Sequence, residues 1–309
     1  MDFDIPADIA AFLQEVDQFI EDKIKPLEDE DDNIRFFDHR REDARTDWDR
    51  GGLPNAGWEA LLHRAKKLAI DAGIFSYPFP KEHGGRDGNN LGMAIIREHL
   101  AAKGLGLHND LQNEHSVVGN NIGLLLMLEY GTPEQQGEWL HGMKTASKGF
   151  AFGITADMVM VRTSGEPGDA LGITAFLVPM DAHGVKIEEY LWTFNMPSDH
   201  AHVTFTNVRV PDSAIFGGEG RGLQVVQHFF NENRMRQAAS SLGAARYCIA
   251  EAVQHANERQ PFGKRLSANQ GIQFPLVELH ARAEMLQALI HKTAWLMDRD
   301  GAFSVSDKV

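Results

Sequence analysis

The chain has 309 residues, of which 43% are hydrophobic and 24% are charged, so its composition is that of a globular protein of two or three domains. A disordered, collagenous or coiled-coil chain is excluded. The 44 acidic and 30 basic side chains give a formal net charge of −14, which makes nucleic acid and anionic membrane surfaces poor partners but leaves room for a local basic pocket.

The single cysteine, Cys248, leaves no intrachain disulfide and no cysteine-based zinc site, and its apolar helical context predicts a small buried residue. No metal site is expected, because the acidic run at residues 28–32 lacks the ligand spacing of a calcium loop and is typical of a solvated loop. The N-terminal residues lack the pattern of a signal peptide, and no apolar run approaches the roughly 18 residues that span a bilayer. We therefore expect a cytoplasmic protein without membrane insertion.

Residues 1–148 predict an N-terminal all-α domain. Apolar residues recur at helical spacing over 9–20 and 58–69, and two further helices are expected over 91–102 and 117–128. Residues 132–134 are Thr-Pro-Glu, which combine a hydroxyl N-cap, a proline at the first helical position and a carboxylate near the positive end of the helix dipole. Another helix therefore begins there.

Residues 149–216 predict a middle β domain. Short β-branched or aromatic segments, separated by Gly, Pro, Asp and His, occupy 150–155, 158–162, 173–178, 185–188 and 203–208. No helix-length segment lies between them, so parallel β-α-β crossovers are excluded and a small antiparallel sheet or barrel is expected.

Residues 217–309 predict a C-terminal helical domain. One helical run extends from Gly220 to Asn257, and a second begins at a Ser267 cap and reaches about Arg299. Two such long helices indicate an antiparallel pair in a helical bundle. The fold class is therefore α+β and mainly α, with α, β and α domains in that order.

The connection between these two long helices carries the most specific motif. Six residues fit the pattern R-x-x-F-G-x-x-L-x-x-x-Q-x-x-x-F, namely Arg259, Phe262, Gly263, Leu266, Gln270 and Phe274. The pattern resembles that of the third domain of the acyl-CoA dehydrogenase family. Earlier in the chain, residues 80–85, 131–136, 172–178 and 210–222 are similar to other sequence motifs of the family and occur in the same order. The resemblance therefore covers essentially the whole chain.

The resemblance implies FAD as cofactor. Arg259, Phe262 and Gln270 would reach the FAD of a neighbouring subunit, which implies a homodimer or a homotetramer. The residue types suit this role, because a guanidinium binds phosphate bidentately and an aromatic face packs on adenine. The segment that includes Phe152 is similar to the family strand that meets the flavin, so Ile154 through its backbone and Thr155 through its hydroxyl would contact the flavin pyrimidine ring.

The resemblance also implies an acyl-CoA substrate. Residues 230–234 are similar to the family's F-D-x-x-R, with asparagine in place of the aspartate. Asn231 and Arg234 are three residues apart, so we expect them on one helical face in contact with the thioester ligand. The implied reaction is α,β-dehydrogenation, with electrons passing to an electron-transfer flavoprotein.

The catalytic base is not assigned. Some family members place it immediately before the arginine equivalent to Arg234, but Asn233 occupies that position and an amide does not accept a proton at neutral pH. Glu232 lies about 100° away round the helix. We therefore expect the family's usual carboxylate beyond Val309.

The chain departs from the family pattern in its middle domain. Only 17 residues separate Thr155 from Ile173, where the family has a longer segment with a flavin-facing strand. Losing central strands would expose sheet edges and empty a core. We therefore expect one of two explanations: this sequence omits residues of the natural protein, or the protein has a true internal deletion and is a non-catalytic remnant. A non-catalytic acyl-CoA-binding or scaffold protein, or another flavoenzyme of this fold such as a nitroalkane oxidase or flavin monooxygenase, are the alternatives.

Overall fold

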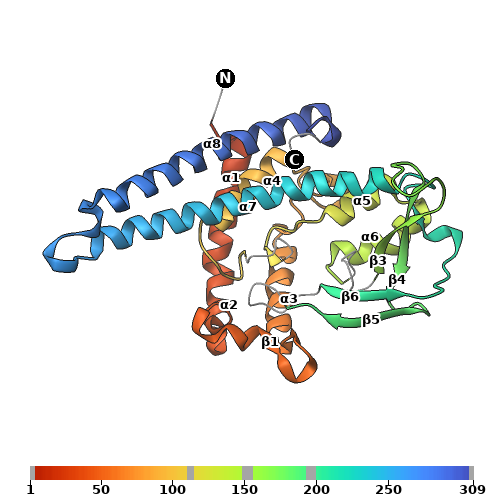
Figure 1. Cartoon of the computed structure of the whole chain (residues 1–309), viewed down its shortest axis with the longest axis horizontal. Coiled ribbons are helices and arrows are strands. Elements are labelled where there is room, and N and C mark those ends of the chain that lie inside the picture. The colour runs from red at the N-terminus through yellow and green to blue at the C-terminus, as the bar shows by residue number, and fades with distance from the viewer. Residues whose placement is uncertain (1–3, 110–114, 148–155, 193–199, 306–309) are drawn as a thin grey trace.

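The N-terminal part of the protein is a group of helices, and a first apolar core lies among its segments from residue 9 to residue 118. The computed structural model describes residues 4–109, 115–147, 156–192 and 200–305 (Figure 1). In chain order the helices are α1 (Ala7–Phe19), α2 (Lys25–Asp29), α3 (Ala56–Asp71), α4 (Asn90–Ala101), α5 (Ile122–Tyr130) and α6 (Pro133–Lys144). A two-residue antiparallel pair, β1 (Thr46–Asp47) with β2 (Leu53–Pro54), lies between α2 and α3.

Local sequence explains where these helices form. The apolar stripe of α1 is buried as its periodicity predicts, through Ile9, Phe12, Leu13, Val16 and Phe19. The predicted start of α6 is confirmed as a capping box, in which Thr132 Oγ1 accepts from the Gln135 amide and the Gln135 side chain accepts from the Thr132 amide. The prediction for α5 was too long, because Asn121 adopts a left-handed conformation (φ 51°) and the helix begins only after it.

The strands form small antiparallel sheets. Strands β3 (Ala156–Arg162), β4 (Ile173–Pro179) and β7 (Ile215–Phe216) are ordered β3-β4-β7, and β5 (Val185–Tyr190) pairs separately with β6 (Ala201–Phe205). The antiparallel prediction is confirmed, but within the described residues the strands make two separate sheets here, not one sheet or a barrel.

The short segment before Ile173 is a closed β-hairpin. Strands β3 and β4 pair in unbroken register, from Ala156 opposite Pro179 to Arg162 opposite Ile173. The Arg162 guanidinium donates to three carbonyl oxygens of the turn, at 2.8 to 3.2 Å. The chain therefore joins these strands directly, and β3 is an edge strand among the strands described.

A second apolar core connects the three-stranded sheet to the helices. It combines residues of α5 and α6 with residues of β4, β7 and the first turn of α7, chiefly Leu124, Leu126, Met127, Trp139, Ala175, Leu177, Phe216 and Val225. The sheet is thus packed against the N-terminal helices, and the start of α7 lies at this junction.

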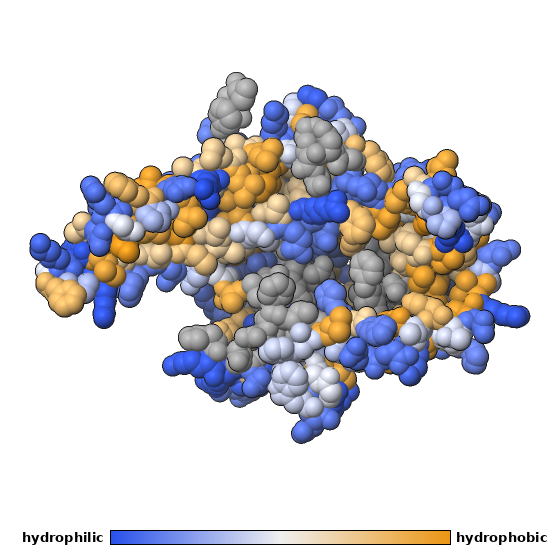
Figure 2. Space-filling view, viewed as in Figure 1, coloured by the Kyte–Doolittle hydropathy of each residue, from blue (hydrophilic) through white to orange (hydrophobic). Residues whose placement is uncertain are grey.

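The C-terminal part is an antiparallel pair of long helices, as predicted. Helix α7 (Gly222–Glu258) has 37 residues and α8 (Gln270–Asp300) has 31, and their connection projects from the body of the molecule (Figure 1). We call this projecting pair the arm. Figure 2 shows apolar side chains along part of the arm. No described helix of the protein has the combination of length and apolar character that crossing a bilayer requires.

Three details differ from the sequence predictions. Cys248 is exposed on α7 because it lies on the arm, where one side of the helix has no covering element among the residues described. The N-cap of α8 is Asn269, whose side chain accepts from the Gly271 amide, and not Ser267. Within the acidic run, Glu28 is partly buried and accepts from the Leu107 amide at 2.6 Å, so that residue is not simply solvated.

The two long helices are joined to α4. At Gly243 the backbones approach so closely that a Cβ atom would lie 2.2 Å from the carbonyl oxygen of Glu98. The Asp298 carboxylate of α8 accepts from the amides of Asn90 and Leu91 at 2.8 and 2.9 Å, and so caps the first turn of α4. Helix α4 is therefore held by both helices of the arm.

Candidate functional site

Three of the predicted cofactor-binding residues meet at the tip of the arm. Arg259 directly follows α7, Phe262 lies in the connection, and Gln270 is the first residue of α8. All three are exposed. Phe262 is fully exposed and has a left-handed backbone conformation (φ 56°), which is unfavourable for a bulky side chain. Contacts within the described chain do not account for this conformation.

The charge at the tip is also uncompensated. The Arg259 carbonyl accepts from the Leu266 amide at 2.9 Å, which closes the connection, but its guanidinium has no hydrogen-bond or ion-pair partner among the residues described. A free guanidinium and an exposed aromatic ring in the same connection match a ligand that carries both a phosphate group and a flat ring. The other three predicted cofactor residues, Phe152, Ile154 and Thr155, lie outside the described residues.

The structure separates the two predicted substrate-binding residues of α7. Asn231 is fully buried, where its Nδ2 donates to the Ala302 carbonyl at 3.0 Å and its Oδ1 accepts from Gln227 at 2.7 Å. Arg234 is exposed, with its guanidinium 5.0 Å from the centre of the Phe230 ring. Residues three apart differ by about 60° round a helix, and here the edge of the buried face falls between them. The expected pairing of the two side chains therefore does not fit this structure.

A row of buried polar side chains on α7 was not predicted from the sequence. His228, Glu232 and Arg236 follow one another at intervals of four residues, with the Glu232 carboxylate 3.2 Å from His228 Nε2 and 2.9 Å from Arg236 Nη2. The His228 ring also contacts the Tyr130 hydroxyl of α5 at 3.0 Å. At the other end, Arg236 Nη1 donates to the Asn120 carbonyl oxygen. The i, i+4 spacing of opposite charges was the available signal.

This row determines the state of Glu232. Burial alone would raise the pKa of the Glu232 carboxyl, but the hydrogen bond from His228 and the charge of Arg236 outweigh burial and lower that pKa. Glu232 is therefore an ionised counter-ion of Arg236 and a poor proton acceptor. Its neighbour Asn233 accepts from Asn120 Nδ2 at 3.2 Å. Neither residue provides a free general base.

Comparison with known families places the chain. Residues 6–147 match the family model for the acyl-CoA dehydrogenase N-terminal domain, and residues 220–308 match the one for the acyl-CoA dehydrogenase C-terminal domain. The chain belongs to the acyl-CoA dehydrogenase family. The family resemblance predicted from the sequence motifs is thereby confirmed.

The proteins that the chain resembles are distant in sequence, and the solved structures among them share its fold. Acyl-CoA dehydrogenase FadE12 of Mycobacterium tuberculosis is 24% identical over 302 aligned residues, which cover 82% of this chain and 76% of that protein. Butyryl-CoA dehydrogenase from Megasphaera elsdenii superposes with a TM-score of 0.73 at 20% identity, covering 99% of this chain and 83% of the other. The FAD complex of PigA superposes with a TM-score of 0.70 at 16% identity, covering 99% and 84%. These likenesses confirm the mainly helical α+β architecture.

Proposed function

We propose that this protein binds FAD and an acyl-CoA thioester and acts in the α,β-dehydrogenation of that thioester. The electrons would pass from the flavin to an electron-transfer flavoprotein. The observation that carries the proposal is the exposed pair Arg259 and Phe262 at the tip of the arm. A free cation and an exposed aromatic ring, three residues apart in the same connection, fit the pyrophosphate and adenine of FAD. The FAD complex of PigA, which has the same fold, supports this cofactor class.

The position of the tip supports an oligomeric FAD site. The tip projects away from the body of its own chain (Figure 1), so a cofactor bound there needs a second body beside it. We infer that Arg259 and Phe262 complete the FAD site of a neighbouring subunit in a homodimer or homotetramer, with Gln270 beside them. Phe152, Ile154 and Thr155 are proposed to supply the flavin contacts within the subunit.

The substrate end of the proposal rests on Arg234. Its exposed guanidinium can hold the phosphates or the pantetheine amides of an acyl-CoA, while the buried row beneath it fixes α7 against α5. Bound FAD would supply the hydride acceptor. The chain's own contribution in this proposal is to bind and orient the two ligands.

A second function, acyl-CoA binding without catalysis, is favoured by the state of Glu232 and Asn233. Abstraction of an α-proton needs a positioned base, and neither residue is free to accept a proton. The closed β3–β4 hairpin supports the same alternative, since it lacks the longer flavin-facing segment that the family resemblance implies.

The first experiment measures FAD binding to the purified chain. Reconstitution with FAD should give a yellow protein with about one FAD per subunit. Arg259→Ala should weaken FAD binding by about 2–4 kcal/mol, because the phosphate charge loses its partner. Arg209→Ala is the control, since it removes another exposed arginine outside the arm. A colourless protein, or equal affinity in the two variants, would contradict the FAD site.

The same sample distinguishes the two functions. Addition of an acyl-CoA to the reconstituted protein bleaches the flavin absorbance if the thioester is dehydrogenated. Acyl-CoA binding by calorimetry without bleaching identifies the non-catalytic alternative. Binding that is unchanged in Arg234→Ala would remove Arg234 from the proposed substrate site.

A further inference from the structure

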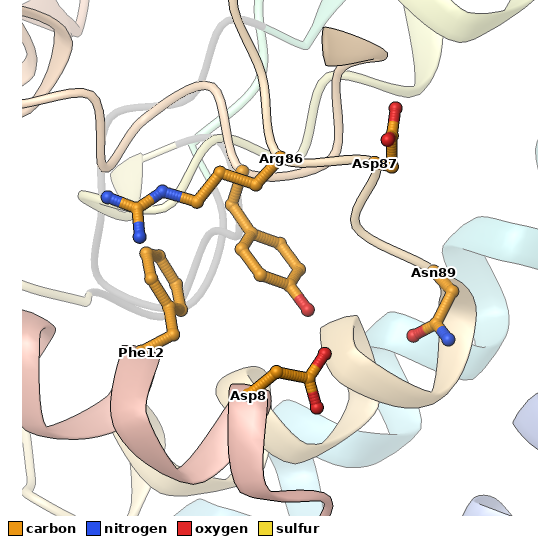
Figure 3. Close-up of a pocket in the computed structure, with 6 residues that line it drawn as sticks. Asp8, Phe12, Arg86, Asp87 and Asn89 are labelled. Carbon is orange, nitrogen blue, oxygen red and sulfur yellow. The ribbon is translucent and has the colours of Figure 1, made fainter.

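A second candidate site lies in the N-terminal domain, apart from the arm. It is a cavity of about 200 Å³ where the start of α1 meets the loop that leads into α4 (Figure 3). The residues that line it are Asp8, Phe12, Tyr77, Arg86, Asp87 and Asn89. At roughly 30 Å³ per water molecule, it has room for a small organic ligand.

Three of the lining polar groups are already engaged. Arg86 forms a two-pronged ion pair with Glu15, with Nη1 2.7 Å from Oε2. Asp87 accepts from the Lys81 amide and pairs with its ammonium group. Asn89 Oδ1 accepts from the Gly92 amide as the N-cap of α4. The positive charge of the wall is therefore matched, and these groups have little capacity left for a ligand.

Tyr77 is different. It is 7% exposed, its ring stacks on Phe12 with centroids 4.5 Å apart, and its hydroxyl has no hydrogen-bond partner in the part of the chain that the structure describes. The hydroxyl lies beside the first turn of α4, since a Cβ atom on Gly92 would be 2.2 Å from it and 3.0 Å from Asn89 Oδ1. The hydroxyl oxygen is itself open to the cavity, so a group of a bound ligand can reach it.

The carboxylates of Asp8 and Asp298 both act on the Tyr77 hydroxyl. Burial, together with the charges of Asp8 and Asp298, raises the pKa of Tyr77 to about 12, although Arg86 opposes the shift. The phenol is therefore neutral at physiological pH and offers an acceptor oxygen. Asp8, in the first turn of α1, makes no hydrogen bond or ion pair among the described residues, and Figure 3 shows its carboxylate facing the cavity.

We propose that this cavity binds a small primary alkylammonium ion. The ammonium group donates one hydrogen bond to the Asp8 carboxylate and one to the Tyr77 hydroxyl oxygen. The short alkyl chain lies against the Tyr77 ring, since the Arg86 guanidinium already lies over the Phe12 ring, 4.7 Å from its centre. The charged ammonium group can donate to the Asp8 carboxylate and to the Tyr77 hydroxyl oxygen at the same time. A metal ion fits less well, since no group of three or more His, Cys, Asp or Glu side chains suited to a metal occurs among the residues described.

The test is calorimetric titration of the full chain with propylammonium chloride and, separately, with propan-1-ol, which has nearly the same shape without the charge. Propylammonium should bind and propan-1-ol should bind at least about tenfold more weakly, the value expected for loss of a hydrogen bond to a charged group. Asp8→Asn should weaken propylammonium binding by about tenfold. The matched control is Asp181→Asn, an exposed carboxylate in the turn after β4, which should leave binding unchanged.

Tyr77→Phe keeps the ring stack and removes only the hydroxyl, so it should weaken propylammonium binding without changing the circular dichroism spectrum. The proposal would be overturned if propan-1-ol bound as tightly as propylammonium, or if Asp8→Asn and Asp181→Asn bound propylammonium equally well. It would also be overturned if propylammonium did not bind, in which case the cavity holds only water. If Tyr77→Phe fails to fold, the Asp8→Asn comparison still decides. The test needs no FAD or acyl-CoA, so its outcome is independent of the proposed flavoprotein function.

Discussion

At the residue scale, the arginine of the buried row shows how an internal charge constrains α7. Arg236 is 2% exposed, and the carboxylate that balances it, Glu232, lies one helical turn earlier on the same helix. Both charges have lost most of their hydration, so their mutual attraction and the contact to Asn120 must replace it. Replacing only one partner of such a pair lowers the free energy of unfolding strongly, because the other charge stays buried without a counter-ion.

Removing only the negative partner should therefore be strongly destabilising. Glu232→Gln leaves the Arg236 charge buried without a counter-ion and should lower the free energy of unfolding by about 3–5 kcal/mol, measured by urea denaturation. Glu251→Gln, an exposed glutamate on the same helix, is the control and should be close to neutral. The double variant Glu232→Gln/Arg236→Met should recover much of the loss. A single variant no less stable than the control would show that the row is solvated.

A buried histidine gives the protein a pH-dependent stability. Burial lowers the pKa of His108 to about 4 from its usual 6.5, against hydrogen bonds to the backbone at Leu100 and Gly104, and the charges of Lys103 and Lys25 add to the decrease. Between pH 6.5 and about 4 the unfolded chain binds a proton that the native His108 does not. Stability is therefore lost as the pH falls through this window, by about 3 kcal/mol in total.

The prediction is tested by urea unfolding at several pH values. His108→Gln should show a smaller loss of unfolding free energy between pH 6.5 and 4 than the unmodified protein, because no proton uptake occurs at that position. His141→Gln, at an exposed position of α6, should retain the full pH dependence. Parallel curves for all three proteins would mean that His108 is not buried in solution.

At the scale of elements, the crossing of α4 and α7 depends on one missing side chain. Gly243→Ala would place a Cβ atom 2.2 Å from the carbonyl oxygen of Glu98, so the helices must separate. The expected cost is about 1–3 kcal/mol of unfolding free energy, despite the better helix propensity of alanine. Thermal or urea unfolding measures it.

Gly137→Ala is the matched control, because Gly137 is also helical, in α6, and nothing lies within 4 Å of its added Cβ atom. That variant should gain up to about 1 kcal/mol from helix propensity. The opposite signs of the two effects separate the crossing geometry from propensity. Stabilisation by both variants would contradict the close approach of α4 and α7.

Elements whose signals are local could be predicted from the sequence. The apolar stripe of α1 and the cap at Thr132 specify their helices within a few residues. The position of Arg259, Phe262 and Gln270 in or next to one connection between helices followed from the predicted helix bounds. The burial of Asn231 could not be predicted, because it depends on Ala302, which is 71 residues away in sequence. The exposure of Cys248 likewise depends on how far the arm extends past the helices that cover its base.

At the scale of the whole molecule, α8 of the arm carries several large apolar side chains that the described residues leave exposed. Exposed apolar residues follow one another along α8, chiefly Phe274, Val277, Leu279, Met285, Leu286, Leu289 and Trp295. Exposed apolar side chains in such number mark an interface in soluble proteins when they gather on one surface. It agrees with the proposed oligomer, in which the tip of the same arm completes a neighbouring FAD site.

A charge on this surface should disrupt the oligomer. The unmodified protein is expected to be a dimer or tetramer by light scattering, and Leu289→Asp should shift it toward smaller species. Leu171→Asp, which changes an exposed leucine in the β3–β4 turn, should leave the mass unchanged. A monomeric unmodified protein that nevertheless holds FAD would disprove the oligomeric site.

The Asp298 cap has a consequence for the order of events during synthesis on the ribosome. It joins the amide of Asn90 to a carboxylate 208 residues later, so the first turn of α4 lacks this cap until most of the chain has been translated. Contacts between such distant segments slow folding, because the loop between them must be closed first. The first turn of α4 is thus expected to fray in the nascent chain and to become fixed only when α8 arrives.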